Sequence, residues 1–586
     1  MKRRHRRLFI CITLMLFWTA ATVYADTYTD LGFDLELVIN ETPYAEAETN
    51  SASSVTTIDS TQIASYRAET TAELISRAIG TTFSSYGALG AAQHVQIRGA
   101  ASDKTLVFLN GVLLGSAHEG AYDISQIPIS IIDRIEIIKS GPGNLGRTNA
   151  IGGMVHIFTK EQDAASPVYP FTLSLENGSF LPLSYDFGQR RWASLIDSQK
   201  IDVGYTASVG PLAVHASVGA IRGANAFTYE DDGSRTIRTN AQMWGAHGSV
   251  LLSGDLLSRV HYDGHTLVNF RQTGVPGSLS YLSDSAQQDD LQLISGHAFT
   301  IASKTSHMLQ EQVLRVQGTF GRTHYQDPDW LTDDTHDKIR LYAQYDQQWE
   351  LSENFALSTG IDAEADHVQS TKVGTINRIT PSLYLHGGVY FGEGKFSLHP
   401  SVQLRYVNDT AVWSPNASLG LLYTVAEPIM IRANVSYAEQ VPTFSQLYWP
   451  EEWGYQGNPD LNTEKGINGD IGVTVTQQKF GYEGSLFVRS LTDAITGDPD
   501  NFYIPINIAQ ALFFGTEQTF TYAPNEVFSF NLSYQYNRSF DLSGSNTISD
   551  DIPVSSVRTH TAKGAISFTP SRYELILHGE YLGSSA

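Results

Sequence analysis

Residues 396–406, FSLHPSVQLRY, decide the class of fold that this sequence predicts. Apolar and polar side chains alternate along the segment, with Phe396, Leu398, Val402, Leu404 and Tyr406 falling between Ser397, His399, Ser401, Gln403 and Arg405. A period of two places the apolar residues on one face of a β-strand. About ten residues is also the length that a tilted strand needs to cross the hydrocarbon layer of a membrane. The segment therefore predicts a transmembrane strand.

The same alternation recurs through the rest of the chain after residue 166. Residues 429–437 and 529–537 are further examples, and aromatic residues stand at the ends of such runs, namely Tyr406, Tyr437, Tyr534 and Tyr536. Aromatic girdles at both membrane surfaces are typical of transmembrane β-barrels. A soluble sandwich also alternates, but its strands are shorter and fewer. The pattern therefore favours a large antiparallel membrane barrel over residues 166–586.

The connections between these strands alternate in length. Tight turns are expected at Pro211 and at residues 393–394 and 524–525, and long loops at residues 223–240, 271–290, 326–337, 440–464 and 540–557. Short turns on one side and long loops on the other are typical of outer-membrane barrels. At about 19–21 residues for each strand and its connection, the segment has room for about 20–22 strands.

Composition excludes several other classes of protein. The chain has 586 residues, only 17% of them charged, with a net charge of −23. An acidic chain without basic clusters does not favour a nucleic-acid partner. Beyond residue 25 there is no apolar run of about 18 residues, so a membrane protein of this sequence must cross as a closed barrel. No catalytic constellation or metal-ligand spacing stands out; paired loop acids such as Asp289 and Asp290 could bind calcium, but none has EF-hand spacing.

The N-terminus predicts a secretory signal peptide over residues 1–25. Basic residues 2–7 precede the apolar residues 8–20, and a small residue, Ala25, stands at the expected cleavage site. The only cysteine, Cys11, lies inside this peptide, so the mature chain is expected to hold no disulfide or thiolate site. Residues 26–50 are polar and predict a mobile periplasmic arm with one short apolar strand-forming segment.

Residues 51–163 predict a small mixed α/β domain. Strands are expected over residues 54–58, 94–97, 105–109, 112–114, 134–139 and 154–159. Asp59 and Thr70 are suited to cap two short helices, the second ending at Gly80, and Asn110-Gly111 is suited to a tight turn. The glycines of residues 141–153 lack the lysine and the following helix of a phosphate-binding loop, so they indicate turns.

Two sets of motifs carry a resemblance to a known family. Val95-Gln96-Ile97-Arg98-Gly99, the segment from Ile132 to Pro142, and Gly152-Gly153-Met154 resemble the plug domain of TonB-dependent outer-membrane receptors. Residues 437–444 and 457–465, YAEQVPTF and GNPDLNTEK, look like the barrel signature of the same family, closest to its cobalamin and siderophore branch. The resemblance covers nearly all of the mature chain.

The resemblance implies a receptor that takes up a scarce organometallic or iron-chelate ligand, such as cobalamin or a ferric siderophore. It implies a monomer in outer-membrane lipid, without a cofactor, driven by a TonB-type protein of the inner membrane. The segment that this partner would bind, the TonB box, is assigned to Asp34, Leu35, Glu36, Leu37, Val38 and Ile39, because a short apolar strand on a tether can add to a sheet edge. A haem receptor, or an enzymatic or adhesive barrel without motor coupling, is the alternative.

The enclosed position of the plug predicts the roles of individual residues. Arg98, Arg134, Glu136 and Lys139 are expected to contact the barrel wall. Ligand contacts are expected at the apex of the plug, at Tyr86, His118, Glu119 and Tyr122, and in the signature loop, at Trp449, Trp453 and Tyr455. Residues 440–458 contain no histidine, which disfavours haem, although His94 and His118 keep that alternative open.

The end of the barrel departs from the family pattern. Barrels of this family end in an aromatic residue, whereas this sequence ends in Tyr581-Leu582-Gly583-Ser584-Ser585-Ala586. This ending indicates either a truncated sequence or a smaller barrel. An unclosed barrel would leave unpaired strand edges facing lipid, which is costly. The first and last strands are therefore expected to pair imperfectly or to leave a gap.

Overall fold

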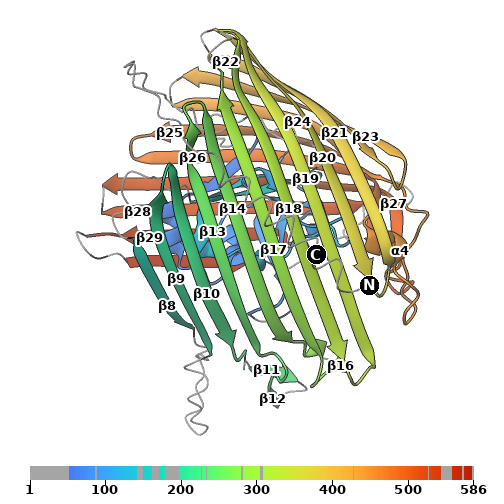
Figure 1. The fold of residues 1–586 in the computed structure, drawn as a ribbon. Helices are drawn as coiled ribbons and strands as arrows, with labels where there is room; N and C mark the ends of the chain where they lie inside the picture. The colour runs from blue at the N-terminus through green and yellow to red at the C-terminus, as the bar shows by residue number, and fades with distance from the viewer. Residues whose placement is uncertain are drawn as a thin grey trace. The chain divides into compact units, whose positions relative to one another are not determined.

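The structure is a computed structural model, and two groups of elements make up its described part (Figure 1). It describes residues 52–85, 87, 89–140, 150–160, 170–178, 197–225, 228–231, 234–278, 281–303, 308–392, 394–426, 428–525, 527–542, 557–570, 573 and 575–583. Within these residues no helix is both long and apolar enough to cross a membrane. Residues 34–39 and Tyr86 lie outside the described part of the chain.

Strands of the second group follow one another round a closed barrel. Nineteen described strands form the ring, close to the predicted 20–22. They are β8 (Phe171–Gly178), β9 (Ser198–Val209), β10 (Leu212–Gly223), β13 (Met243–Leu257), β14 (Val260–Gly274), β17 (Gln287–Ala302), β18 (Leu309–Asp327), β19 (Thr332–Ser352), β20 (Phe355–Ser370), β21 (Gly374–Phe391), β22 (Phe396–Val407), β23 (Val412–Ala426), β24 (Ile429–Gln440), β25 (Glu464–Gln477), β26 (Phe480–Gly497), β27 (Pro505–Asn525), β28 (Phe528–Asp541), β29 (His560–Phe568) and β30 (Leu575–Leu582).

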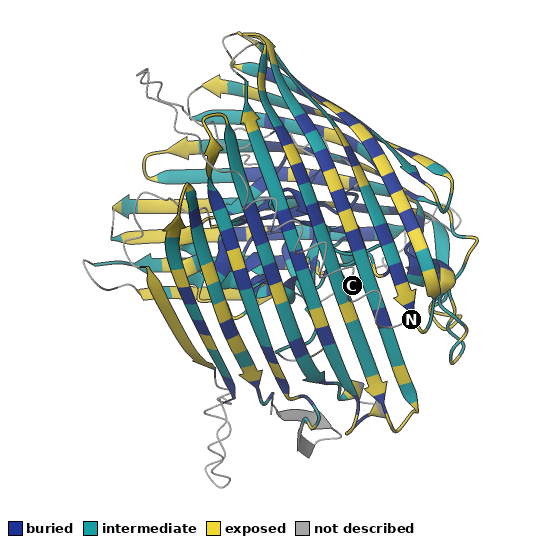
Figure 2. Ribbon diagram, viewed as in Figure 1, coloured by how far each residue is buried: buried dark blue, intermediate teal, exposed yellow. Residues whose placement is uncertain are grey.

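The barrel buries polar side chains and exposes apolar ones, the reverse of a soluble protein. On β22, Ser401 and Gln403 are buried while Val402 between them is exposed. Figure 2 shows the resulting alternation of buried and exposed residues along the barrel strands. An apolar outer face and a polar interior are what a strand that meets lipid on one side and a polar lumen on the other requires. The period of two in the sequence therefore predicted the faces of the residues at the centre of β22 correctly.

The loops agree in part with the expected lengths. The connection of residues 441–463 contains the helix α4 (Phe444–Tyr448), and two small hairpins lie in other long loops: β11 (Thr228–Asp231) with β12 (Ser234–Ile237), and β15 (Gly277–Ser278) with β16 (Tyr281–Leu282). The predicted long loop of residues 326–337 is wrong, because β18 continues to Asp327 and β19 begins at Thr332. Strands β18 and β19 have 19 and 21 residues, about twice the membrane-crossing length, so their polar ends extend the sheet beyond the hydrocarbon layer.

The sequence predicted that the first and last strands pair imperfectly or leave a gap. Strands β30 and β8 are neighbours in the closed ring, so the gap is wrong. Every other neighbouring pair in the ring is antiparallel, so with nineteen strands β8 and β30 run in the same direction. With eight residues each, they are also the shortest strands of the ring.

The first group of elements is the small domain of the N-terminal part, called the plug from here on. Its main sheet has the order β1-β6-β7-β4-β5, and β2 pairs with β3. The elements are β1 (Val55–Ile58), α2 (Ser60–Tyr66), α3 (Thr71–Ser76), β2 (Thr81–Ser85), β3 (Gln93–Ile97), η1 (Ser102–Lys104), β4 (Leu106–Leu109), β5 (Val112–Leu113), η2 (Ile124–Gln126), η3 (Ile129–Ile131), β6 (Ile132–Ile138) and β7 (Met154–Thr159).

Capping and apolar burial explain the local structure of the plug. Asp59 caps α2 with a capping box and Thr70 caps α3, as the sequence predicted. One apolar core joins both helices to the sheet, and Leu251, Leu267 and Ile294 of the barrel wall belong to the same core. The plug is therefore packed against the inside of the wall and not merely enclosed by it.

The turn before β7 is tightly packed around Gly152. A Cβ at this position would lie 2.5 Å from the carbonyl oxygen of Lys104, a backbone atom that cannot swing away. We expect Gly152→Ala to destabilise the plug by about 1–3 kcal/mol because overpacking forces the backbone to shift. Limited proteolysis of the purified protein would detect faster cleavage within the plug. Gly579→Ala in β30 is the matched control, since a Cβ there meets nothing within 4 Å; equal cleavage rates in the two variants would contradict the expectation.

Candidate functional site

Arg98 is the centre of a buried group of charges between the plug and the wall. It follows β3, is only 2% exposed, and adopts a left-handed backbone with φ of 50°. Its guanidinium lies 3.0 Å from Glu517 of β27 and 3.4 Å from Asp470 of β25, and it stacks 4.3 Å from the ring centre of Phe487. Burial alone would lower the pKa of Arg98, but the two carboxylates outweigh it and raise that pKa. Arg98 is therefore charged.

Two plug lysines extend this group of charges. Lys139 lies 3.3 Å from the same Glu517 carboxylate, so Glu517 receives two cations from the plug. Lys104, which the sequence did not single out, lies 2.8 Å from the fully buried Glu464 of β25. The feature of the sequence that could have indicated this pair is Glu464, which stands in the barrel signature at residues 457–465. Buried cations on the plug and buried anions on the wall therefore face each other in pairs.

Arg134 and Glu136 lie differently from Arg98 and Lys139. Arg134 pairs with Glu136 on the same strand, at 3.1 Å, and its guanidinium lies 3.9 Å from the ring centre of Phe158. All three residues belong to the plug, and Glu136 is buried. These contacts lie within the plug, and contact of this pair with the barrel wall stays a prediction.

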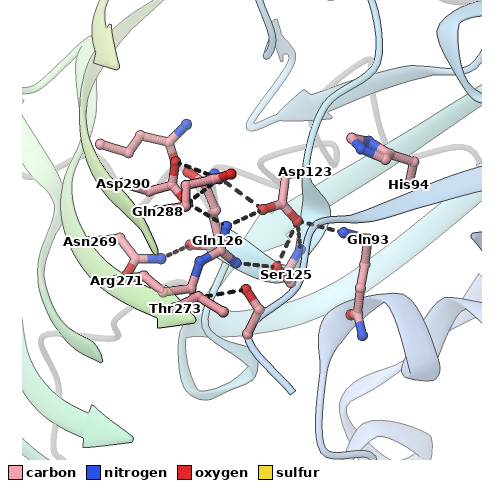
Figure 3. Close-up of polar contacts among 12 residues, drawn as sticks. Gln93, His94, Asp123, Ser125, Gln126, Asn269, Arg271, Thr273, Gln288 and Asp290 are labelled. Atoms are coloured by element: carbon pink, nitrogen blue, oxygen red, sulfur yellow. Dashed lines mark hydrogen bonds and ion pairs between the residues drawn. The ribbon is translucent and has the colours of Figure 1, made fainter. Parts of the chain in front are cut away.

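A second plug–wall network lies near the long-loop end of the barrel. Asp123 caps η2 and receives a hydrogen bond from the backbone N–H of Gln93 at 2.9 Å. Figure 3 shows Arg271 of β14 between Asp123 and Asp290 of β17, with distances of 2.8 Å and 2.9 Å. Beside it the wall residue Asn269 donates to the carbonyl of Gln126 at 3.0 Å (Figure 3). The sequence analysis did not predict this network. Two features could have indicated it: Asp123 stands at the start of a helical turn, and Arg271 lies on the inward face of a barrel strand.

Asp123→Asn is expected to weaken the upper attachment of the plug. Burial alone would raise the pKa of Asp123, but Arg271 and several hydrogen bonds hold it below its ordinary value. A lowered pKa means that the pair contributes its stability above about pH 4 and loses it as the pH falls through the lowered pKa. Asp123→Asn should therefore cost about 2 kcal/mol at pH 7.

Thermal unfolding at pH 7, in a double-mutant cycle with Arg271→Gln, measures the coupling between the two side chains. Asp460→Asn, at an exposed loop position, is the matched control. A coupling energy below about 0.5 kcal/mol would contradict the assignment.

The apex of the plug is held by the helix of the long signature loop. The backbone N–H of Phe444 donates to the carbonyl of Ala117 at 2.8 Å, and that of Ser445 to the carbonyl of His118 at 3.0 Å. Gly120 approaches so closely that a Cβ there would lie 2.8 Å from the methyl group of Thr443. The loop of residues 441–463 therefore contacts the plug directly and can transmit a change at the entrance to it.

The predicted ligand residues differ in their accessibility. His118 is 1% exposed, and burial lowers its pKa to about 4, so its imidazole is neutral at physiological pH. Tyr122 is buried and donates to Gln292 of the wall at 2.9 Å. A ligand could reach these two side chains only after the apex moves. Glu119 is half exposed and lies 2.9 Å from Lys338, with which it lines a cavity between apex and wall.

The three aromatic residues of the signature loop lie at the entrance. Trp449 and Tyr455 are half-buried and Trp453 is exposed. The structure adds Trp330, from the turn between β18 and β19, whose ring lies 5.7 Å from that of Trp453. No sequence motif joined these two residues, because more than a hundred positions separate them.

The comparison with known protein families agrees with this geometry. Residues 47–154 match the family described as "TonB-dependent Receptor Plug Domain", and residues 176–586 match "TonB dependent receptor-like, beta-barrel". The chain belongs to the TonB-dependent receptor family. This TonB-dependent receptor accordingly has a plug and an outer-membrane barrel, and it is a ligand-uptake receptor that works with a TonB partner.

Individual relatives of this TonB-dependent receptor are distant. It is 24% identical over 518 residues to the vitamin B12 transporter BtuB of Photobacterium profundum, covering 85% of this chain and 78% of the relative. A BtuB of Vibrio cholerae is 31% identical over 124 residues, which is 21% of this chain and 20% of the relative.

Solved structures share the fold. The ferric enterobactin receptor PfeA of Pseudomonas aeruginosa, solved as a mutant, has a TM-score of 0.73 at 15% identity, over 92% of this chain and 86% of that one. The copper transporter OprC has a TM-score of 0.72 at 13% identity, over 91% and 84%. The names of these relatives and neighbours describe receptors and transporters, not enzymes.

Proposed function

We propose that this receptor carries a scarce organometallic or iron-chelate ligand, such as cobalamin or a ferric siderophore, across the outer membrane by energised uptake. The choice of ligand is supported by a relative named a vitamin B12 transporter and by structural neighbours named siderophore receptors. Transport without enzymatic conversion of the ligand is part of the proposal. The ligand would meet the loops of residues 441–463 and the turn that carries Trp330 before it reaches the apex of the plug.

The observation that carries this proposal is the set of buried plug–wall contacts. Arg98 and Lys139 share Glu517, and Lys104 pairs with Glu464, all with the side chains buried. A plug joined to the wall in this way blocks the lumen until work is done on it, because buried ion pairs are costly to break one partner at a time. Uptake therefore requires an external source of energy.

The energy would enter through the arm before the plug. Residues 34–39 are the proposed TonB box, since a short apolar strand can add to the edge of a partner's sheet. Residues 1–25 are the proposed signal peptide, residues 26–50 the arm, residues 51–163 the plug and residues 166–586 the barrel. The working form would be a monomer in outer-membrane lipid, without a nucleic-acid partner.

Growth rescue tests the proposed function. A bacterial strain that lacks its own receptors for cobalamin and ferric siderophores would carry this protein and be given each ligand as the only source of the nutrient. We expect rescue by at least one of them, and only while the inner-membrane motor is present. Rescue that persists without the motor, or no rescue by any ligand of the panel, would refute the proposal.

A further inference from the structure

Large aromatic side chains from three separate connections stand exposed at the long-loop end of the barrel. Trp330 lies between β18 and β19, Trp453 in the loop of residues 441–463, and Phe502 with Tyr503 between β26 and β27. Their exposed fractions are 52%, 83%, 65% and 67%. The rings of Trp330 and Trp453 meet edge to face, at 5.7 Å and 88°. We call these four residues the aromatic rim.

The aromatic rim is built by ordered contacts between the loops. A Cβ at Gly454, next to Trp453, would lie 2.7 Å from the Phe502 ring, so the two loops touch. The side chain of Asn458 donates to the carbonyl of Pro505 at 3.0 Å and ties the same two loops together. These loops hold large aromatic side chains outward and so expose apolar surface to water. A large exposed apolar patch on a surface that faces water usually marks a binding site.

The backbone supports the same conclusion. Trp453, Phe502 and Tyr503 have φ values of 55°, 50° and 60°, in the left-handed region that bulky residues rarely adopt. Backbone strain of this kind persists only where the surroundings enforce it, and it is frequent at ligand clamps. The loops therefore hold these three residues in an unfavourable backbone conformation that places their rings at the entrance.

The charge around the aromatic rim limits what it can bind. The loops of residues 441–463 and 498–504 contain no lysine or arginine, but they carry the carboxylates Glu451, Glu452, Asp460, Asp498 and Asp500. The basic side chains that stand nearby are paired with carboxylates: Lys372 with Asp334 at 3.2 Å and with Glu452, Lys338 with Glu119 at 2.9 Å, and the 46% exposed Lys465 with Asp493 at 3.9 Å. An approaching anion thus meets a surplus of negative charge.

We propose that the aromatic rim is the first binding site for the cargo of this receptor, and that it takes an uncharged or cationic ligand with a planar ring system. The rings offer stacking surface to such a ligand, and a cation gains in addition from the π faces. Polyanionic chelates, such as ferric tris-catecholates, are repelled by the unneutralised carboxylates. The inference rests on the proposed function and narrows its two ligand classes to one.

Equilibrium binding to the purified full-length protein in detergent tests the inference, with cyanocobalamin as the uncharged ring probe and ferric enterobactin as the trianionic probe. We expect ferric enterobactin to bind at least about tenfold more weakly, an effect of the size that close like charges produce. Trp330→Ala with Trp453→Ala should weaken cyanocobalamin binding by about tenfold or more, since two stacking surfaces are lost.

Two further variants make the outcome decisive. Trp413→Ala removes an exposed tryptophan from the outer face of β23 and should leave binding unchanged. Asp460→Lys with Asp500→Lys reverses two exposed charges and should raise the affinity for ferric enterobactin. Equal or tighter binding of ferric enterobactin by the unaltered protein, or unchanged cyanocobalamin binding in the double tryptophan variant, would overturn the inference. Self-association that disappears in the same variant would assign the aromatic rim to a second copy of the chain and overturn it too.

Failure of this inference and failure of the proposed function have separate readouts. Binding to the purified protein needs no motor, whereas growth rescue does. Preferential, rim-dependent binding without energised growth would leave the inference standing and refute the proposed function. Energised growth on a ferric catecholate alone would do the reverse.

Discussion

Glu517→Gln is expected to loosen the plug inside the barrel more than any other single substitution at their contact. Glu517 is the shared partner of Arg98 at 3.0 Å and of Lys139 at 3.3 Å, and all three side chains are at most 5% exposed. A glutamine of the same shape leaves Lys139 without its counter-ion and leaves Arg98 with Asp470 alone, at 3.4 Å. Breaking a buried pair from one side costs about 3–5 kcal/mol, and here two pairs break together.

The packing around Glu517 offers no easy relaxation. A Cβ at Gly80 would lie only 2.2 Å from the Glu517 carboxylate, so the backbone of the plug stands directly against it. Arg98→Ala should be milder, because Lys139 still neutralises Glu517, and we expect it to lower plug retention or transport to a smaller extent. The expected order of effects is therefore Glu517→Gln above Arg98→Ala.

Sensitivity of cells to a large antibiotic that the outer membrane normally excludes measures plug retention, and thermal unfolding of the purified protein measures its stability. Glu483→Gln is the matched control, because Glu483 pairs with the wall residue Arg432 and its side chain is 27% exposed. Replacing Arg98, Lys139, Asp470 and Glu517 together by apolar residues should restore much of the stability that Glu517→Gln loses, because the whole group of paired charges is then removed. Sensitivity and melting temperature equal to those of Glu483→Gln would refute this role for Glu517.

Deletion of residues 34–39 should abolish energised uptake while leaving ligand binding intact. The segment stands before the plug, and its expected role is to add a strand to a sheet edge of the TonB partner. Since the segment precedes the plug in the sequence and is expected to bind the partner and not the ligand, the affinity of the purified protein for its ligand should stay unchanged. Uptake of radiolabelled cyanocobalamin by cells, compared with binding at the cell surface, separates the two steps.

Residues 43–48 are a suitable control deletion, because they shorten the same arm by the same length and leave the apolar segment in place. Uptake should survive that deletion. Retained uptake after removal of residues 34–39 would exclude them as the TonB box, whereas loss of uptake in both deletions would show that the length of the arm is what matters.

Much of the architecture was predictable from local patterns. The period of two assigned inward and outward faces on β22 because membrane and lumen impose opposite demands on neighbouring residues. Strand β7 begins and ends at the predicted residues, and the caps Asp59 and Thr70 act within three positions of themselves. Strand β2 was missed, since Thr81–Ser85 is short and mostly polar and is stabilised by its partner β3.

The contacts of the site were predictable only in part. Arg98 stands in a family motif, but its partner Glu517 lies 419 positions away, and no local pattern couples them. The same holds for Asp123 with Arg271 and for Trp330 with Trp453, where the register of the barrel decides which side chains meet. Arg134 and Glu136, which were expected to contact the wall, pair with each other along one strand, and their contact with the wall stays a prediction.

The pairing of β1 with β6 determines how tension would travel through the molecule. Strand β1 is an edge strand of the plug sheet, and the N–H of Lys139 donates to the carbonyl of Ser54 at 2.9 Å, just where the chain enters the plug. A pull on the arm is therefore applied first to this end of the β1–β6 ladder, next to the Val55–Ile138 pair. The residue at this end is Lys139, whose ammonium group pairs with Glu517. The last hydrogen bond of the β1–β6 ladder and the ion pair to Glu517 both involve Lys139, so a ladder that opens from this end reaches Lys139 first.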